Sequence, residues 1–273
     1  MIARTLAQRV VIRTSERTAF EAIKFLACDP EIVPAQETTS VLTAEPFGGS
    51  YRISENGKND SEVIGLTALV EHLHYRVTSL SLLAKPHAGI LHAALLRRGS
   101  RRVLISGRAA AGKTTLALRL VQAGYALEGD EHVFVEDDGV TARPRACRVK
   151  EASLSFLPGV AKAIATAPVY IDHLGRKLFN VDPRMIGGTW RIEKGRAERI
   201  IMLQPNHGGY TTLHRLQPLA LSQALISELA VREAGRGATI GAVARLASAS
   251  KGYDLSLGDH DTAIKCIDRA LED

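Results

Sequence analysis

The sequence predicts an α/β fold built around a phosphate-binding loop, and three consecutive segments carry this prediction. Residues 103–106 form a short apolar run that is typical of a buried strand. Residues 107–114 match the pattern G-x-x-x-x-G-K-[ST] without a mismatch. Residues 115–123 have the pattern of a helix, which Gly124 is expected to end. Strand, glycine loop and helix thus follow one another in the order that a phosphate site requires.

The predicted nucleotide-binding segment supplies its anion contacts mainly from the backbone. The two glycines let N–H groups converge on phosphate oxygens, and the N-terminus of the following helix adds a favourable dipole. The Lys113 side chain is expected to reach the β- and γ-phosphates, and the Thr114 hydroxyl is expected to ligate Mg²⁺. The whole segment comprises Gly107, Arg108, Ala109, Ala110, Ala111, Gly112, Lys113, Thr114 and Thr115.

Composition fits a globular enzyme of one large or two small domains. The chain has 273 residues, of which 45% are hydrophobic and 23% charged, with a net charge of +6. A positive charge suits a phosphate-rich ligand or an acidic partner. No basic helix is interleaved with aromatic residues, so a solvated basic surface is favoured over a nucleic-acid site.

Cysteine usage and the chain's apolar segments predict a cytoplasmic protein without a membrane partner. Cys28, Cys147 and Cys266 are odd in number and far apart, which argues against a disulfide framework and a zinc site. Residues 1–20 lack the apolar core of a signal peptide, and no stretch reaches the length of a membrane span.

The chain is predicted to divide near residue 86, into a small α+β region (1–86) and a phosphate-loop domain (87–273). The first region is expected to contain a strand at 6–13, a helix at 18–27, two strands around 47–49 and a helix at 62–83. His72 and His74 are two residues apart, so on a helix they face different sides and are interpreted as ordinary helix residues rather than a metal pair.

The second region is expected to open with strands at 89–96 and 101–107, joined by a hairpin turn at residues 99–100. The four arginines at 97, 98, 101 and 102 are interpreted as a solvated tip, with an acidic partner as the alternative. His92 has small apolar neighbours, which favours a buried histidine. Helices are expected at 217–233, 240–249 and 259–273, where they complete the core or form a subunit contact.

Asp130 and Glu131 form a second candidate cluster. Asp130 follows Lys113 by only 17 residues, so one short helix and a strand at 125–128 return the chain to the phosphate loop. Beside a triphosphate, one carboxylate can ligate Mg²⁺ and the other can accept a proton from an attacking hydroxyl. A helix N-cap or a turn with two acids fits the same residues, and the pattern alone favours neither interpretation.

Three motifs together resemble HPr kinase/phosphorylase, and more closely the HPr-kinase-related proteins of bacterial gene clusters, some of which phosphorylate peptides such as lasso peptides. The motifs are the run Leu91-His92-Ala93-Ala94, the phosphate loop and the Asp130-Glu131 pair, with 15 residues from His92 to Gly107. Looser matches occur at 143–145, 149–150, 200–203 and 215–219. The resemblance covers roughly residues 87–235.

The resemblance implies a phosphate-loop sheet of the type shared by HPr kinase and phosphoenolpyruvate carboxykinase. It implies ATP- and Mg²⁺-dependent transfer of the γ-phosphate to a serine or threonine hydroxyl of a peptide or protein. Asp130 would be the general base, Glu131 a magnesium ligand, and His92 a neighbour of the phosphate or of Asp130. Arg145 and Lys150 would neutralise charge on the transferred group. A homo-oligomer is a further implication, since the family often forms hexamers.

The chain departs from the family in four respects. Ala110 replaces a third loop glycine, which is compatible with the compact turn only if that residue keeps a negative φ. Glu131 replaces an aspartate. The arginine-glycine motif linked to phosphorylase activity is not recognisable in residues 151–188, and residues 1–86 do not match the N-terminal domain of HPr kinase.

Other phosphate-loop classes match less well or remain as alternatives. The Asn-Lys-x-Asp motif of GTPases and the Leu-Ser-Gly-Gly-Gln motif of transporter ATPases are both absent. A plain ATPase in which Glu131 polarises water, a small-molecule kinase, and a non-catalytic nucleotide-binding subunit remain open.

Overall fold

The computed structural model describes residues 2–4, 9–27, 39–83, 85, 87–165, 169–172, 174–230 and 236–273. The protein is a mixed α/β structure whose sheets combine parallel and antiparallel pairs.

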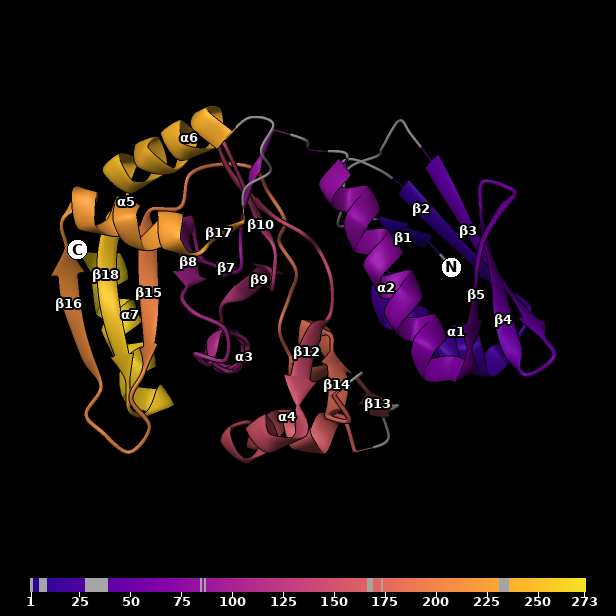
Figure 1. The fold of residues 1–273 in the computed structure, drawn as a ribbon. Helices are drawn as coiled ribbons and strands as arrows, with labels where there is room; N and C mark the ends of the chain where they lie inside the picture. Colours follow the sequence, from indigo (N-terminus) through magenta and orange to yellow (C-terminus); the bar gives the residue numbers. More distant parts are fainter. Residues whose placement is uncertain are drawn as a thin grey trace. The chain divides into compact units, whose positions relative to one another are not determined.

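It forms two compact units: unit 1 comprises 1–85 and 144–182, and unit 2 comprises 86–143 and 183–273 (Figure 1). The predicted division near residue 86 coincides with one of the unit boundaries. The segment 144–182 belongs with the N-terminal region, since Ala146 packs against the core of that region.

Unit 1 contains a five-stranded sheet in the order β1-β2-β3-β4-β5, in which only the β2–β3 pair is parallel. Alternate residues such as Val10 and Ile12 are fully buried, and they form one core with Leu69 and Leu73 of α2. The elements are β1 (Ile2–Arg4), β2 (Arg9–Thr14), α1 (Arg17–Ile23), η1 (Lys24–Leu26), β3 (Thr39–Phe47), β4 (Ser50–Glu55), β5 (Lys58–Ile64) and α2 (Gly65–Leu83).

The helix predicted at 62–83 begins at Gly65, because residues 58–64 form the edge strand β5. A tight turn at Asn56-Gly57 pairs these residues with β4 and so makes them a strand. Asn56 and Gly57 have φ values of 51° and 80°, and two left-handed residues in a two-residue turn are the geometry that closes a hairpin. The polar composition of β5 had concealed the strand, whereas the Asn-Gly pair was the available signal.

The remainder of unit 1 is a small antiparallel sheet in the order β12-β14-β13. Two short helical segments connect β12 to β13. The elements are β12 (Cys147–Lys150), η2 (Glu151–Phe156), α4 (Pro158–Ala163), β13 (Val169–Ile171) and β14 (Lys177–Val181).

Unit 2 is organised around a six-stranded sheet in the order β16-β18-β15-β8-β7-β9. Strands β18, β15 and β8 are parallel, and the other pairs are antiparallel. Helices α3 and α7 contact each other, as do α5 and α6 (Figure 1). The bounds are β7 (Ala94–Arg98), β8 (Arg101–Ser106), α3 (Lys113–Gln122), β9 (Ala126–Gly129), η3 (Pro183–Ile186), β15 (Arg199–Pro205), β16 (Thr212–Leu216), α5 (Pro218–Ser227), α6 (Arg236–Ala249), β18 (Lys251–Leu257) and α7 (His260–Glu272).

A second sheet of unit 2 has the order β11-β10-β6-β17 and is antiparallel throughout. Its strands are β6 (Gly89–Leu91), β10 (Val133–Glu136), β11 (Gly139–Ala142) and β17 (Leu229–Ala230). The core cluster that includes Leu91, Val133 and Val140 also contains Leu104 of β8 and Leu221 of α5. One hydrophobic core therefore joins the two sheets and α5.

Two predicted elements of unit 2 are divided in the structure. The strand expected at 89–96 is two strands, β6 and β7, which belong to different sheets. The helix expected at 217–233 ends at Ser227, because the chain then pairs with β6 as β17, and residues 231–235 lie outside the described part. The predicted hairpin at 99–100 is confirmed by the antiparallel β7–β8 pair.

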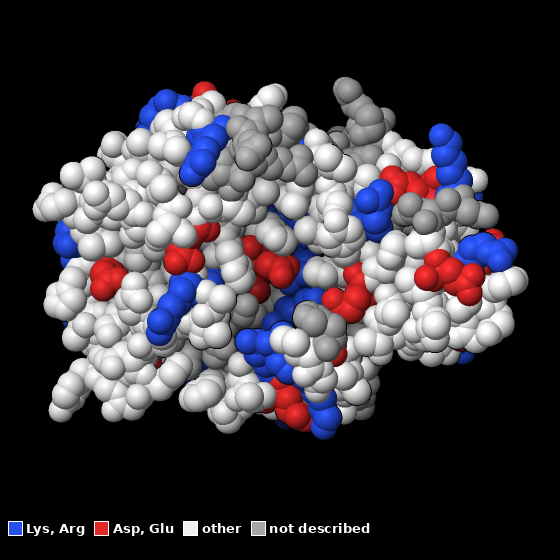
Figure 2. Space-filling view, viewed as in Figure 1, with Lys and Arg blue, Asp and Glu red and all other residues white. Residues whose placement is uncertain are grey.

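Charged groups of both signs lie side by side on the face shown in Figure 2. Among the ion pairs of unit 2, Lys194 pairs with Glu136 and Asp138. No helix in the described part of the chain combines the length and apolar character needed to cross a bilayer.

Candidate functional site

The predicted phosphate loop lies between the end of β8 and the start of α3. Both motif glycines are required by the backbone. Gly107 has a φ of 145°, and a Cβ atom there would lie 2.5 Å from the Leu203 carbonyl oxygen of the neighbouring strand β15. Gly112 has a φ of 97° and is the N-cap of α3. The glycines therefore let the loop turn back tightly against the sheet.

Ala110 has a φ of 63°, so the compact turn does not require a negative φ at this residue, contrary to the condition stated above. The loop forms its compact turn with alanine in the left-handed region. This conformation costs a residue with a Cβ atom about 1–2 kcal/mol. The loop thus retains the turn that a third glycine would allow and carries backbone strain at that residue.

Backbone strain is concentrated at this site. Within the described ranges, three non-glycine residues have a positive φ: Asn56, Ala110 and Glu131. Asn56 is explained by its hairpin turn. Ala110 lies in the phosphate loop, and Glu131, with a φ of 84°, directly follows the candidate acid Asp130. Strained residues that surrounding structure holds in place are typical of binding and catalytic sites.

Lys113 is almost completely buried beneath the loop. Its Nζ donates hydrogen bonds to the carbonyl oxygens of Gly107 at 2.5 Å and of Arg108 at 2.9 Å. Burial lowers the pKa of the ammonium, and the nearby charge of Asp130 opposes this shift. The two hydrogen bonds hold the ammonium against the loop that is predicted to bind phosphate.

Asp130 and the phosphate loop meet through Thr114. The Thr114 hydroxyl donates a hydrogen bond of 2.8 Å to Oδ2 of Asp130, across 16 residues of sequence. Strand β9 returns the chain to this point. A Cβ atom on the intervening Gly129 would lie 2.6 Å from the Arg143 carbonyl oxygen. The predicted metal-binding hydroxyl and the predicted acid therefore lie in direct contact.

The residues that follow Asp130 exclude the helix N-cap interpretation, because the next element is strand β10. Glu131 is partly exposed, and its Oε2 lies 3.9 Å from Nδ1 of His132. Leu91 pairs with Val133, so the chain leaves β6 at His92 beside the point where it enters β10. The structure thus places His92 just after the end of β6, beside the start of β10, which follows Glu131 by two residues.

His92 itself is exposed, in contrast to the buried histidine that its neighbours favoured. The reason is the break between β6 and β7. The side chain lies on the two-residue connection where the chain leaves one sheet for the other, while Ala93 and Ala94 are fully buried.

Arg145 and Lys150 belong to unit 1, whereas the phosphate loop belongs to unit 2. Arg145 is buried, and its Nη1 lies 2.6 Å from Nε2 of His74. Lys150 is exposed at the end of β12. Their role in neutralising a transferred phosphoryl group remains a prediction. His72 instead contacts the Ser61 hydroxyl, so the two helix histidines face different partners, as their spacing predicted.

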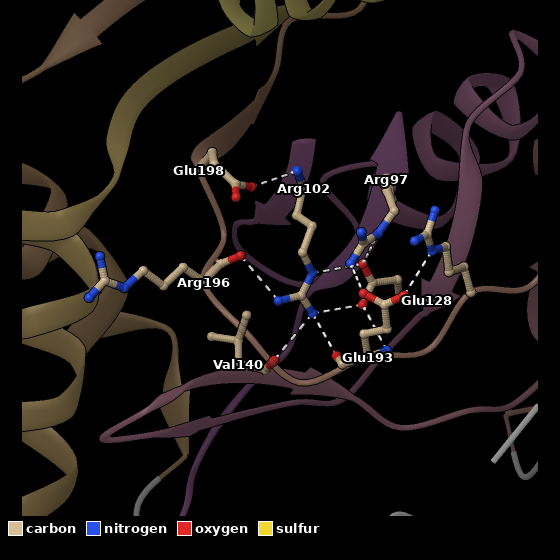
Figure 3. A network of polar contacts seen from close by, with 8 residues as sticks. Arg97, Arg102, Glu128, Val140, Glu193, Arg196 and Glu198 are labelled. Carbon is tan, nitrogen blue, oxygen red and sulfur yellow. Dashed lines mark hydrogen bonds and ion pairs between the residues drawn. The ribbon is translucent and has the colours of Figure 1, made fainter. Parts of the chain in front are cut away.

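The arginines of the β7–β8 hairpin do not all form a solvated tip. Arg97 and Arg102 are buried, and both contact the fully buried carboxylate of Glu128 (Figure 3). Arg102 binds it in a bidentate manner, with Nε 2.8 Å from Oε1 and Nη2 2.7 Å from Oε2. The solvated interpretation is wrong for these two residues. Arg98 and Arg101 are exposed, and Arg98 also forms an ion pair with Asp268.

The sequence carried no local signal for the burial of Arg97 and Arg102, because the neighbouring strand residues are buried on both faces of the sheet. Arg97 lies opposite Arg102, and Leu95 lies opposite Leu104, in the same antiparallel pair. Residues two apart share a face, so both arginines lie on the face whose leucines enter the core. A buried cation there requires an acid, and Glu128 supplies it from β9.

Asp172, His173, His207 and His214 have different surroundings. Asp172 closes a local turn: its Oδ2 accepts a hydrogen bond of 2.7 Å from Nε of Arg176, and its Oδ1 accepts from the backbone N–H groups of Leu174 and Arg176. His173 lies outside the described residues. His207 and His214 are exposed in unit 2, on the turn after β15 and on β16.

Magnesium bound with a nucleotide needs few protein ligands, because phosphate oxygens and water complete its octahedral shell. Thr114 and Asp130 offer a hydroxyl and a carboxylate, which are the oxygen ligands that this ion prefers. Among the described residues, no group of three or more histidine, cysteine, aspartate or glutamate side chains is placed to hold a metal ion. The donor set therefore fits Mg²⁺ bound together with a nucleotide.

No family model matches the chain, and no curated protein matches it significantly.

Proposed function

We propose that the protein is an ATP- and Mg²⁺-dependent kinase that transfers the γ-phosphate to a serine or threonine hydroxyl of a peptide or protein. We further propose that unit 2 is a phosphate-loop sheet of the HPr kinase and phosphoenolpyruvate carboxykinase type. The observation that carries the proposal is the 2.8 Å contact between Thr114 and Asp130, directly beside the buried Lys113.

Each group of the site has a chemical role in this proposal. Lys113 and the N–H groups at the start of α3 bind the β- and γ-phosphates. Thr114 and one acid hold Mg²⁺, which spreads the negative charge of the phosphates when it is bound. The other acid accepts the proton of the attacking hydroxyl. The resemblance assigns the base role to Asp130 and the metal role to Glu131, while the Thr114 contact supports a place for Asp130 in the metal shell.

The test is a transfer assay with purified protein, Mg²⁺ and γ-labelled ATP, with and without the peptides or proteins encoded near its gene. We expect Lys113→Ala to lose nucleotide binding, because it removes the cation that faces the phosphates. We expect Asp130→Asn to keep ATP binding and to lose transfer. Asp137→Asn is the matched control, since this acid is exposed on the β10–β11 turn. Full transfer by Asp130→Asn would refute the proposal.

The same assay separates the alternatives. Free phosphate without a labelled acceptor indicates an ATPase in which Glu131 polarises water. Label on a small molecule indicates a small-molecule kinase. Tight nucleotide binding with no turnover indicates a non-catalytic nucleotide-binding subunit.

A further inference from the structure

We infer that Glu128 is a positioning residue for Asp130: together with Arg102 it ties the strand that carries Asp130 to the strand that carries the phosphate loop. The inference rests on the proposed function, in which Asp130 and Thr114 act on one Mg²⁺-bound nucleotide.

The two strands concerned are not neighbours in the sheet. The order is β15-β8-β7-β9, so β7 separates the loop strand β8 from β9. Arg102 extends from β8 across this gap and binds the carboxylate of Glu128 on β9 through two hydrogen bonds of 2.8 and 2.7 Å (Figure 3). A bidentate arginine–carboxylate pair fixes orientation as well as distance. This contact therefore sets the position of β9 relative to β8 directly.

The backbone pairing of β9 leaves Glu128 without a regular partner. Leu95 pairs with Gly129 and Leu96 pairs with Leu127, so the register shifts and Glu128 is the extra residue of a bulge. Bulges commonly redirect a side chain beside a functional site. The backbone pairing between β7 and β9 is thus interrupted at Glu128, two residues before Asp130. The side-chain contact of Glu128 with Arg102 therefore fixes the position of β9 where the backbone pairing does not.

The Arg102 end of the contact is itself held. The Arg102 guanidinium also donates to the backbone carbonyl oxygens of Arg196 at 3.1 Å, Val140 at 3.2 Å and Glu193 at 2.8 Å. The Arg102 backbone N–H donates to the Glu198 carboxylate at 2.7 Å. Five polar contacts, three of them shared by the two N–H groups of Nη2, thus leave the guanidinium one orientation, and the buried carboxylate of Glu128 must follow it.

Glu128→Gln tests the inference, because it keeps the size of the side chain and removes the charge. The readouts are ATP affinity with EDTA and ATP affinity with Mg²⁺, measured by calorimetry. We expect ATP affinity without metal to stay within about twofold, because the phosphate loop is untouched. We expect the gain in affinity on adding Mg²⁺ to fall about tenfold, as is typical when a residue that orients a metal ligand is changed.

Two further variants separate positioning from a merely structural role. Glu193→Gln is the matched control: its carboxylate binds Arg97 at 2.5 Å in the same network, and no hydrogen bond joins that carboxylate to β9 among the described contacts. We expect it to keep the wild-type Mg²⁺ response. The double variant Arg102→Met/Glu128→Met removes both charges of the bidentate pair, and Arg97 keeps its ion pair with Glu193, so the fold is expected to survive while the Mg²⁺ response stays weak.

The outcomes are distinct. A wild-type Mg²⁺ response in Glu128→Gln, or its return in the double variant, would overturn the inference while leaving the proposed function intact. ATP binding that is indifferent to Mg²⁺ in the unsubstituted protein and in Asp130→Asn would refute the proposed function, and the inference with it.

Discussion

The strain at Ala110 leads to a prediction about the phosphate loop with a definite sign. Ala110 has a φ of 63°, a conformation that glycine adopts without penalty. We expect Ala110→Gly to stabilise unit 2. Ala109, the preceding residue, is also exposed and does not have a positive φ. Ala109→Gly therefore removes the same methyl group without relieving strain, and we expect it to destabilise unit 2.

The magnitudes follow from two opposing terms. Relief of the left-handed conformation contributes about 1–2 kcal/mol. The greater freedom of glycine in the unfolded chain costs about 0.4–1 kcal/mol in either variant. The net change is a gain of about 0.5–1 kcal/mol for Ala110→Gly and a loss of about 0.4–1 kcal/mol for Ala109→Gly. The unfolded-state term is common to both, so the difference between the variants measures the left-handed penalty itself.

The protein contains one tryptophan, Trp190, which lies in unit 2 and bridges to Leu127 of β9. Urea unfolding followed by its fluorescence therefore reports on the unit that holds the loop. With a slope of about 2 kcal/mol per molar, the midpoints of the two variants should differ by about 0.5–1 M. Equal loss of stability in both variants would show that Ala110 carries no strain, and the reasoning would be refuted.

Two further predictions concern the other strained or constrained positions. Gly129→Ala places a Cβ atom 2.6 Å from the Arg143 carbonyl oxygen, so it should cost about 1–3 kcal/mol and reduce transfer activity by displacing Asp130. Gly237 lies in α6, and no atom lies within 4 Å of a Cβ added there. Gly237→Ala should therefore stabilise unit 2 by about 0.5–1 kcal/mol. Urea unfolding compares the stability of the Gly129→Ala and Gly237→Ala variants. The hydrogen bond from Arg176 lowers the pKa of Asp172 to about 2, whereas the pKa in the unfolded chain is about 4. The stability that this carboxylate contributes is therefore present above a pH of about 4 and is lost as the pH falls toward about 2. Asp172→Asn should flatten the stability of unit 1 over that pH window, and an unchanged pH profile by circular dichroism would contradict the assignment.

Local sequence determined the glycine loop between β8 and α3, its flanking strand and helix, and the β7–β8 hairpin. Each depends on interactions within a few residues: the φ freedom of Gly107 and Gly112, the apolar run of β8, and the tight turn at residues 99–100. Short-range rules suffice where the energy that decides a conformation is local. The Asn56-Gly57 hairpin belongs to the same class, although the polar composition of β5 concealed it.

Tertiary structure alone decided which side chains meet. Thr114 reaches Asp130 because β9 returns to the loop, and Arg102 is buried because Glu128 arrives from a strand two positions away in the sheet. His92 is exposed because the chain changes sheets beside it. A residue's burial and charge partner depend on contacts between distant segments, and such contacts exist only after the strands have assembled. The sequence by itself therefore predicted the kind of site, and the fold determined which residues lie together there.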